Sequence, residues 1–362
     1  MSSDLQTRPD VPPLPRAARF GPVLSFVLRP WPVLVSGVLA AGTFVVFCLS
    51  IRLGDFPLSF VDVVRAIFGQ GDSVTVFIVH DLRMPRALVG VLVGAALGMS
   101  GAIVQSIARN PLASPDILGI TAGAGVLAVF LVTSTGGLAA AVTEGVGLPA
   151  ASLVGGLLTG VLVYVLAFRG GIDGMRLILI GVAITALMQA LITWMIVRAD
   201  IRDAARAQTW LVGSLEARTW SQVTAVAVVG GIAAVVALGA AFALKAVQLG
   251  DDVARGLGVP LTVTRAVLLI AAVLLAAIAV SASGPIAFVA FVSPQVAMRL
   301  TRLPAPPLIP AALTGAFLLT GADLVARVIL PVQLPVGIVT AGVGGPFLVY
   351  LLVRNNLKAS KK

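Results

Sequence analysis

A serine among small residues is the first candidate for chemistry in this chain. Gly98-Met99-Ser100-Gly101 matches the G-x-S-G pattern of a serine nucleophile on a helix. Such a serine needs a base within hydrogen-bond reach, and the single histidine, His80, lies in an expected outer loop rather than on a neighbouring helix. The sequence therefore favours Ser100 as a small packing residue over an intramembrane serine protease.

The residue counts exclude most other chemistry. One histidine and one cysteine, Cys48, exclude an intrachain disulfide and argue against a structural zinc site. The chain also lacks the G-x-x-x-x-G-K-[ST] pattern of a phosphate-binding loop. We therefore expect no catalytic residue, no bound metal and no cofactor, and any ATP-driven work is expected from a partner subunit.

A polar stripe marks one apolar segment as different from the others. Gly181, Thr185, Gln189 and Thr193 follow one another at i, i+4 spacing, so they share one face of a helix that is otherwise Leu, Ile, Ala and Met. Polar groups facing lipid would cost several kcal/mol each (order of magnitude). The stripe therefore faces either another helix or water, which leaves an interhelical seam and a pore lining as alternatives.

Arginines at the predicted span mouths are the next unusual feature. Arg83, Arg86 and Arg327 lie on the predicted outer side, where orientation alone does not place positive charge. Asp323, four residues before Arg327, predicts an i, i+4 ion pair. No acidic residue lies in the middle of a predicted span, which disfavours an ion-coupled secondary transporter.

The apolar runs between these residues define the elements that position them. Of the 362 residues, 59% are hydrophobic and 11% are charged, and the apolar runs approach the roughly 20 residues that cross a bilayer. We expect an all-α polytopic membrane protein of about ten helices and not an outer-membrane barrel. The predicted spans are 31–52, 86–107, 115–134, 148–168, 175–198, 220–244, 264–282, 284–300, 306–327 and 335–353.

The distribution of charge predicts the orientation of these spans. Most of the 25 Lys and Arg residues fall on one side when both termini are cytoplasmic, as the positive-inside rule demands. The net charge of +10 is therefore assigned to orientation and not to a nucleic-acid partner. We expect a disordered cytoplasmic tail over 1–30, a membrane domain over 31–353 and a cytoplasmic C-terminal tail over 354–362.

Small residues and caps predict further local structure. Gly90, Gly94 and Gly98 recur every four residues, so a neighbouring helix backbone is expected to approach this face closely. Ser59 followed by Asp62 predicts a short amphipathic helix that Gly69 ends, on the outer surface.

A second short helix is expected on the cytoplasmic side, in the segment 249–260. Asp251 and Asp252 stand at its N-terminal end, and Gly258 and Pro260 follow its last turn. The helix is too polar to insert into a membrane, and Val253 and Leu257 are expected to be exposed on it. Such a helix is suited to the groove of a soluble partner protein.

The chain resembles the FecCD family of ABC-transporter permeases, which import ferric siderophores, haem or vitamin B12. The resemblance runs from about residue 80 to 350 in the order of the family's motifs. It differs at Gln295 and Gln333, where the family often has His and Glu. The residues that carry the resemblance are Arg83-Met84-Pro85-Arg86, Gly94-Ala95-Ala96-Leu97-Gly98, Gln105, Asn110-Pro111-Leu112-Ala113 with Pro115 and Gly119, Trp210 with Gly213-Ser214-Leu215, the 249–259 segment, Gly284-Pro285-Ile286-Ala287-Phe288-Val289, Gly321-Ala322-Asp323 with Arg327, and Pro335-Val336-Gly337 with Gly344 and Pro346.

The resemblance implies a type II importer architecture with ten helices and both termini inside, in a bacterial cytoplasmic membrane. It implies that the fifth and tenth spans line the pathway, which assigns the polar stripe to the pathway, and that Asp173, Gly174 and Met175 form the inner gate. It implies docking of a substrate-binding protein at Arg83, Arg86 and Arg327. It also implies that an ATPase subunit docks on Asp251, Asp252, Ala254, Arg255, Leu257 and Gly258.

The expected function is therefore that of the non-catalytic membrane subunit of a binding-protein-dependent importer, with a ferric siderophore as cargo. Alternating access would be driven by two ATPase subunits, and a second copy or a paralogue would complete the pore. Haem or vitamin B12 remains the alternative cargo within the same family. The sequence does not distinguish a homodimer from a heterodimer, nor one siderophore from another.

Overall fold

The computed structural model describes residues 17–20, 24–27, 29–54, 56–134, 147–169, 173–329 and 332–359. Nearly all of the described elements are helices, as expected, and three of them, named η, are π-helical. The helices are α1 (Pro30–Arg52), α2 (Phe60–Ile67), α3 (Ser73–Phe77), η1 (Ile78–Arg83), α4 (Met84–Ala108), α5 (Ile120–Thr133), α7 (Gly147–Ala167), α8 (Gly174–Arg198), α9 (Ile201–Val212), α10 (Trp220–Ala225), η2 (Val226–Gly230), α11 (Gly231–Gly239), α12 (Ala241–Leu249), α13 (Asp251–Gly256), α14 (Leu261–Ser283), α15 (Val289–Thr301), α16 (Leu308–Leu324), η3 (Val325–Ile329) and α17 (Val336–Ala359).

Eight helical runs among the described residues are long and apolar enough to cross a membrane. The other two expected spans contain shorter helices, α5 with 14 residues and α15 with 13. Both begin five residues later than expected because the chain before them is not helical. Pro115 and Gly119 interrupt the first, and Gly284 and Pro285 interrupt the second. Gly119 and Gly284 have φ of 79° and 72°, in the left-handed region that glycine tolerates.

The segment expected to be a disordered tail contains a small hairpin. Strands β1 (Ala17–Phe20) and β2 (Leu24–Val27) pair antiparallel, with Ala17 opposite Val27 and Phe20 opposite Leu24. Each strand is only four residues long, which is too short to signal a strand in the sequence. The expectation of disorder is therefore wrong for these eight residues.

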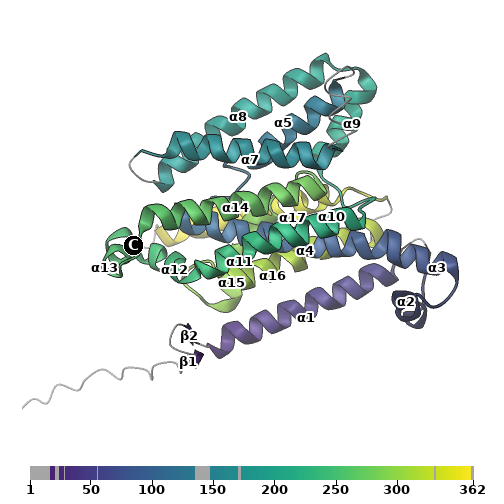
Figure 1. Cartoon of the computed structure of the whole chain (residues 1–362), viewed down its shortest axis with the longest axis horizontal. Coiled ribbons are helices and arrows are strands. Elements are labelled where there is room, and N and C mark those ends of the chain that lie inside the picture. Colours follow the sequence, from purple (N-terminus) through teal and green to yellow (C-terminus); the bar gives the residue numbers. More distant parts are fainter. Residues whose placement is uncertain are drawn as a thin grey trace, which may run out of the picture.

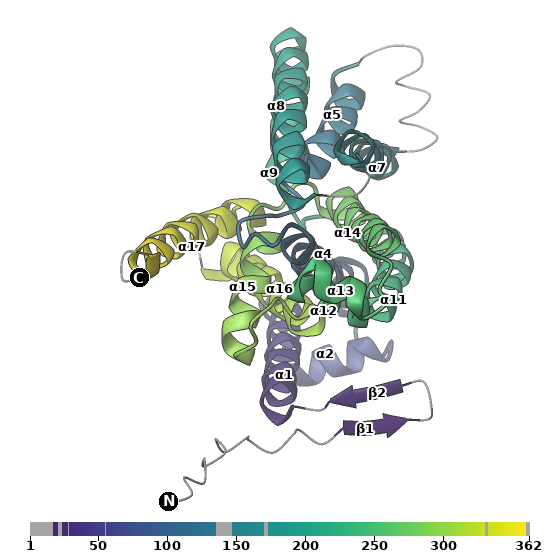
Figure 2. The same cartoon turned by 90° about the vertical axis from the view of Figure 1, so that its left-hand side faces the viewer.

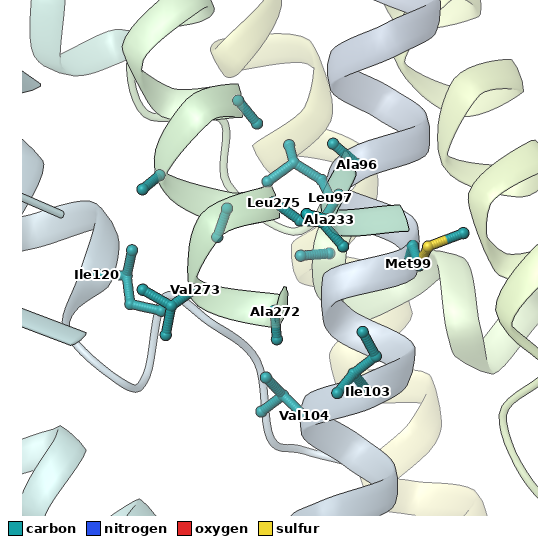
Figure 3. Close-up of a cluster of buried hydrophobic side chains, with 14 of the residues drawn as sticks. Ala96, Leu97, Met99, Ile103, Val104, Ile120, Ala233, Ala272, Val273 and Leu275 are labelled. Carbon is teal, nitrogen blue, oxygen red and sulfur yellow. The ribbon is translucent and has the colours of Figure 1, made fainter. Parts of the chain in front are cut away.

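Helix α4 lies at the centre of the packed helices, between α14 and α16 (Figures 1 and 2). Its side chains Leu97 and Val104 lie opposite Leu275 and Ala272 of α14, and Ala233 of α11 closes the same cluster (Figure 3). This burial on several sides explains why α4 and α14 are apolar around their whole circumference.

Glycines bring α4 into backbone contact with its neighbours, as the sequence predicts. A Cβ at Gly94 or Gly98 would overlap the carbonyl of Gly315 or Ala311 on α16, and one at Gly101 would overlap that of Ala290 on α15. Gly90, by contrast, faces the side chains of Leu215 and Thr320. Close helix approach through small residues is confirmed for two of the three predicted positions.

The helices form two groups (Figures 1 and 2). Helices α5, α7, α8 and α9 lie together beside the larger group around α4, and α14 contacts both groups (Figures 1 and 2). Helices α12 and α13, the start of α1 and the end of α17 lie at one end of the molecule, and α2 and α3 lie at the other (Figure 1). These ends are called the α13 end and the α2 end below.

The two short helices expected from their caps are both present. Ser59 and Asp62 form a reciprocal capping box at the start of α2, and α13 follows Gly250. On α2, Val63 and Ala66 are buried, whereas Val64 and Phe68 are exposed.

Candidate docking, coupling and pathway surfaces

Arg83 holds the α2 end of α1 and η1 together. The side chain is buried, with 8% of the residue exposed. Its guanidinium donates hydrogen bonds to the carbonyl oxygens of Ile51 at 2.9 Å, Arg52 at 3.1 Å and Phe56 at 2.6 Å. The carbonyls of Ile51 and Arg52 are orphan acceptors at the end of α1, and Phe56 lies in the loop that follows. Arg83 therefore has a structural task at the position where the sequence predicted a docking residue.

Asp323 pairs with Arg86 and not with Arg327. The guanidinium of Arg86, in the first turn of α4, donates from Nη2 to Oδ1 at 2.8 Å and from Nε to both carboxylate oxygens at 3.1–3.2 Å. The Asp323 side chain is 3% exposed. Arg327 instead donates to the carbonyl oxygen of Ser50 at 2.6 Å and to its hydroxyl at 3.1 Å. The expected i, i+4 pair is wrong because a longer-range partner reaches the carboxylate.

The predicted docking arginines gather at the α2 end. A Cβ at Gly54 would lie 3.0 Å from Nη2 of Arg83 and 3.5 Å from Nη1 of Arg327. The residues Arg83, Arg86 and Arg327, called the arginine group below, thus tie α1, α4 and the α16–η3 run to one another. Ser50, which no local sequence pattern marks, belongs to the same network through Arg327.

The predicted coupling residues on α13 divide into two sets. Asp252 and Arg255 have side chains 99% and 67% exposed and form an i, i+3 pair at 3.3 Å, and Leu257 is 55% exposed. Ala254, by contrast, is fully buried and packs with Ala246 and Val259. The exposed set, called the α13 face below, consists of Asp252, Val253, Arg255 and Leu257.

Asp251 belongs to the inward set. Its carboxylate accepts hydrogen bonds from Arg265 of α14 at 2.6 Å and from Arg109, which follows α4. Burial by itself would raise the pKa of the Asp251 carboxyl, but the hydrogen bonds and charges of Arg265 and Arg109 outweigh it and hold that pKa below its usual value. No local pattern in the sequence connects Arg109 or Arg265 with Asp251, because they lie 142 and 14 positions away from it.

The polar stripe of α8 is not uniform. Gly181 is buried, and a Cβ there would lie 2.7 Å from the carbonyl oxygen of Ile117. The Thr185 hydroxyl is shared among carbonyl oxygens, including that of Ile117 at 3.2 Å. Gln189 and Thr193 are exposed on the described chain. One half of the stripe therefore forms a seam with the segment before α5, and the other half is open.

The three predicted gate residues lie at the start of α8, at the α13 end. The Asp173 side chain accepts a hydrogen bond from the backbone N–H of Arg176 at 2.9 Å and caps the helix. A Cβ at Gly174 would lie 2.8 Å from the carbonyl oxygen of Ala108, at the end of α4. Met175 is exposed. Asp173 and Met175 are therefore exposed at the start of α8, while Gly174 lies against the end of α4.

Ser100 is a packing residue, as the sequence favours. Its hydroxyl is buried and donates to the carbonyl oxygen of Ala272 at 2.7 Å. His80 is in η1, which continues into α4, and not in a loop as expected. At 1.5 Å per residue, His80 and Ser100 lie about 30 Å apart along this run. Within the described residues, no three His, Cys, Asp or Glu side chains gather as metal ligands.

The fold and these surfaces define a multi-pass membrane protein with a central, tightly packed helix and a protruding short helix at one end. The chain belongs to the FecCD transport family, whose model matches residues 42–354. It is thus a transport permease subunit of the kind that the sequence resemblance indicated.

Curated relatives match along almost the whole chain. It is 38% identical over 330 residues to the ferric enterobactin transport system permease protein FepG of Escherichia coli strain K12, covering 90% of this chain and 96% of that protein. It is 36% identical to the iron(3+)-hydroxamate import system permease protein FhuG of Bacillus subtilis strain 168, covering 90% and 98%. The achromobactin transport system permease protein CbrC of Dickeya dadantii strain 3937 is 37% identical, covering 85% and 88%.

A solved structure has the same fold. The chain of a putative metal-chelate type ABC transporter, determined in an inward-facing conformation, superposes with a TM-score of 0.77 at 26% identity. The match covers 90% of this chain and 100% of that one. The all-α polytopic prediction is confirmed by this likeness and by the described helices.

Proposed function

We propose that this chain is the membrane subunit of a binding-protein-dependent importer in a bacterial cytoplasmic membrane, and that its cargo is a ferric siderophore. The observation that carries this proposal is the family match over residues 42–354 together with relatives whose names specify iron chelates. Haem and vitamin B12 are the alternative cargoes, and both termini are expected in the cytoplasm.

Deleting the gene is expected to abolish uptake of at least one ferric siderophore by the source cells under iron limitation. The measurement is cell-associated radioactive iron, supplied as catecholate, hydroxamate and citrate chelates in parallel, with haem and vitamin B12 uptake as controls. Uptake of iron that depends on ATP and returns with a plasmid copy supports the proposal. Loss confined to haem or vitamin B12 would replace the cargo with that compound.

An ATPase subunit is proposed to bind the α13 face. Short, exposed apolar side chains flanked by charges are the chemistry that a groove on a soluble protein recognises, and Val253 and Leu257 supply it here. Two ATPase subunits are expected for each transporter, with a second copy of this chain or a paralogue completing the pathway.

The α2 end is proposed to receive the substrate-binding protein through the arginine group. Complementary charge chiefly raises the association rate and fixes the orientation of the partners, so acidic patches on the binding protein would suit this surface. Arg83 has little exposed area and three carbonyl partners. Its proposed role is therefore to hold the docking surface in shape, while Arg86 and Arg327 contact the partner.

The pathway is proposed to follow the open half of the α8 stripe, at Gln189 and Thr193, down to Met175 at the inner gate. A lining of short polar groups suits a bulky chelate that must pass without being held. Gly181 and Thr185 support this pathway by joining α8 to the segment before α5, because their polar groups are used within the chain.

Cysteines at Gln189 and Thr193 are expected to react with a membrane-impermeant thiol reagent after Cys48 is replaced by serine. The thiolate is the reactive form and requires water, so a water-filled pathway labels these positions. Ile192 is buried next to Thr193, so Ile192→Cys is the matched control and should stay unlabelled. Cysteines at Leu187 and Leu191 should also stay unlabelled because these positions are expected to face lipid. Protection of both Gln189→Cys and Thr193→Cys in the assembled transporter would remove them from the pathway.

A further inference from the structure

Asp251 is the one residue of α13 whose side chain reaches both central helices in the described part of the chain. Nη2 of Arg265 lies 2.6 Å from its Oδ1, and Nη2 of Arg109 donates to the same oxygen. Arg265 is in the second turn of α14, and Arg109 directly follows the last turn of α4. A single carboxylate therefore connects the start of α13 to α14 and to the end of α4.

Arg109 also fastens the chain before α13. Its Nε and Nη2 donate to the carbonyl oxygen of Val247, at 3.2 and 2.9 Å, near the end of α12. Its own backbone is in the left-handed region, with φ of 48°, and its N–H is bonded to the carbonyl oxygen of Gln105. This conformation is unfavourable for a residue with a side chain, so the end of α4 is held in the geometry that aims the guanidinium at α12 and α13.

Apolar packing supplies little of the connection between α13 and the core. Ala254 is the only buried side chain of α13, and its cluster contains only short segments next to α13, from α12 and the start of α14. A cavity of about 330 Å³ lies by the ends of α4 and α12, and its lining residues include Arg109, Gln248 and Gln295. Hydrogen bonds across this region, such as Gln248 to Ser106 at 2.7 Å, take the place of close packing.

The negative charge of Asp251 persists at physiological pH. The hydrogen bonds and charges of Arg265 and Arg109 hold the pKa of the Asp251 carboxyl below its usual value, so this carboxylate stays ionised. Arg265 is 12% exposed and Asp251 is 32% exposed at their side chains, so solvent screens this pair less than an ordinary surface pair. The Arg265–Asp251 pair is therefore better shielded than the Arg109–Asp251 pair, in which the Arg109 side chain is 42% exposed.

We propose that Arg109, Asp251 and Arg265 form an ionic joint that transmits a displacement of α13 to α4 and α14. Asp251 is then a positioning residue that acts through the two arginines, and it is not a contact residue for the ATPase. The inference rests on the proposed function, because it requires that the ATPase binds the α13 face. It adds the connection by which movement of that face reaches the transport helices.

The test is the ratio of cargo transported to ATP hydrolysed in the assembled transporter, reconstituted with its ATPase and binding protein. Asp251→Asn removes the charge but keeps the shape. We expect the ATPase to co-purify and to hydrolyse ATP, while transport per ATP falls about five-fold or more, the lower end of a typical coupling energy. Asp251→Glu should recover part of the ratio because it restores the charge.

Two further variants separate the joint from docking and from stability. Asp252→Asn alters the neighbouring acid on the α13 face, so it should lower ATPase association and transport together with the ratio unchanged. Asp203→Asn alters an acid paired with a single arginine on α9 and should change neither. If Asp251→Asn folds poorly, Arg109→Gln and Arg265→Gln should each lower the same ratio in the folded fraction.

The outcomes distinguish the ionic joint from docking of the ATPase. An unchanged ratio in folded Asp251→Asn and in both arginine variants would overturn the joint and leave ATPase docking intact. Loss of ATPase association in Asp251→Asn, to the same degree as in Asp252→Asn, would also overturn it by making Asp251 a contact residue. ATPase association that survives changes of the α13 face would contradict the proposed function instead.

Discussion

Replacing Leu257 with aspartate is expected to release the ATPase subunit from the purified permease and to abolish transport. Leu257 is 55% exposed on the α13 face, so the substitution meets no packing constraint inside the permease. A buried charge in the groove of a partner costs far more than the apolar contact it replaces. For an interface residue of this kind the expected loss is about 2 kcal/mol or more, or roughly 30-fold in affinity.

The measurement is pull-down of the ATPase by the permease in detergent, with membrane insertion checked by expression and gel filtration. Leu257→Met keeps the apolar contact and is the matched control, which should retain the ATPase. Normal co-purification and normal transport by Leu257→Asp would remove α13 as the docking site. Loss of inserted permease in both variants would point to a folding role for Leu257 instead.

Removing the Arg86 side chain alone is expected to destabilise the permease strongly, because it leaves the Asp323 carboxylate buried without its partner. The carboxylate is 3% exposed and accepts hydrogen bonds from Arg86 at two nitrogens. Breaking a buried ion pair from one side costs about 3–5 kcal/mol, whereas replacing both partners by apolar residues is often neutral. Arg86→Met should therefore lower thermal stability in detergent, and Arg86→Met with Asp323→Leu should recover most of it.

The same two variants test docking of the binding protein separately from an effect on folding. If Arg86 also contacts the binding protein, the recovered double variant should hydrolyse ATP at the basal rate but respond less to the binding protein. The response should weaken with salt in the unmodified protein, because the Debye length is about 8 Å at physiological ionic strength. Full stimulation in the double variant would limit Arg86 to its structural role, and equal stability of the single and double variants would contradict the pairing argument.

Local features of the sequence were sufficient for several elements. The capping box of Ser59 and Asp62 predicted α2, and the acids and glycines around 251–258 predicted α13, because a cap depends on residues within one turn. The spacing of Gly94 and Gly98 predicted a close helix neighbour, although not that the neighbour is α16. The first residues of α5 and α15 were placed too early because Gly119 and Gly284 interrupt segments that remain apolar.

Side-chain partners that are distant in the sequence could not be predicted from local patterns. Arg86 and Asp323 are separated by 237 positions, and Arg109 and Asp251 by 142. Asp323 has Arg327 one helical turn away, so the local rule selected the wrong partner. The α8 stripe is a regular pattern in the sequence, but its division at Thr185 depends on the segment before α5, which contacts only one half of the helix.

The sequence by itself determined that this protein crosses the membrane many times, which side its charges favour and which family it resembles. These properties follow from composition, run length and short motifs, since the cost of placing a residue in lipid depends mainly on that residue. Only the tertiary structure decided which arginine neutralises Asp323, which residues of α13 remain exposed and which acid connects α13 to α4 and α14. These contacts depend on which helices become neighbours, and that choice is made by the packing of the whole chain.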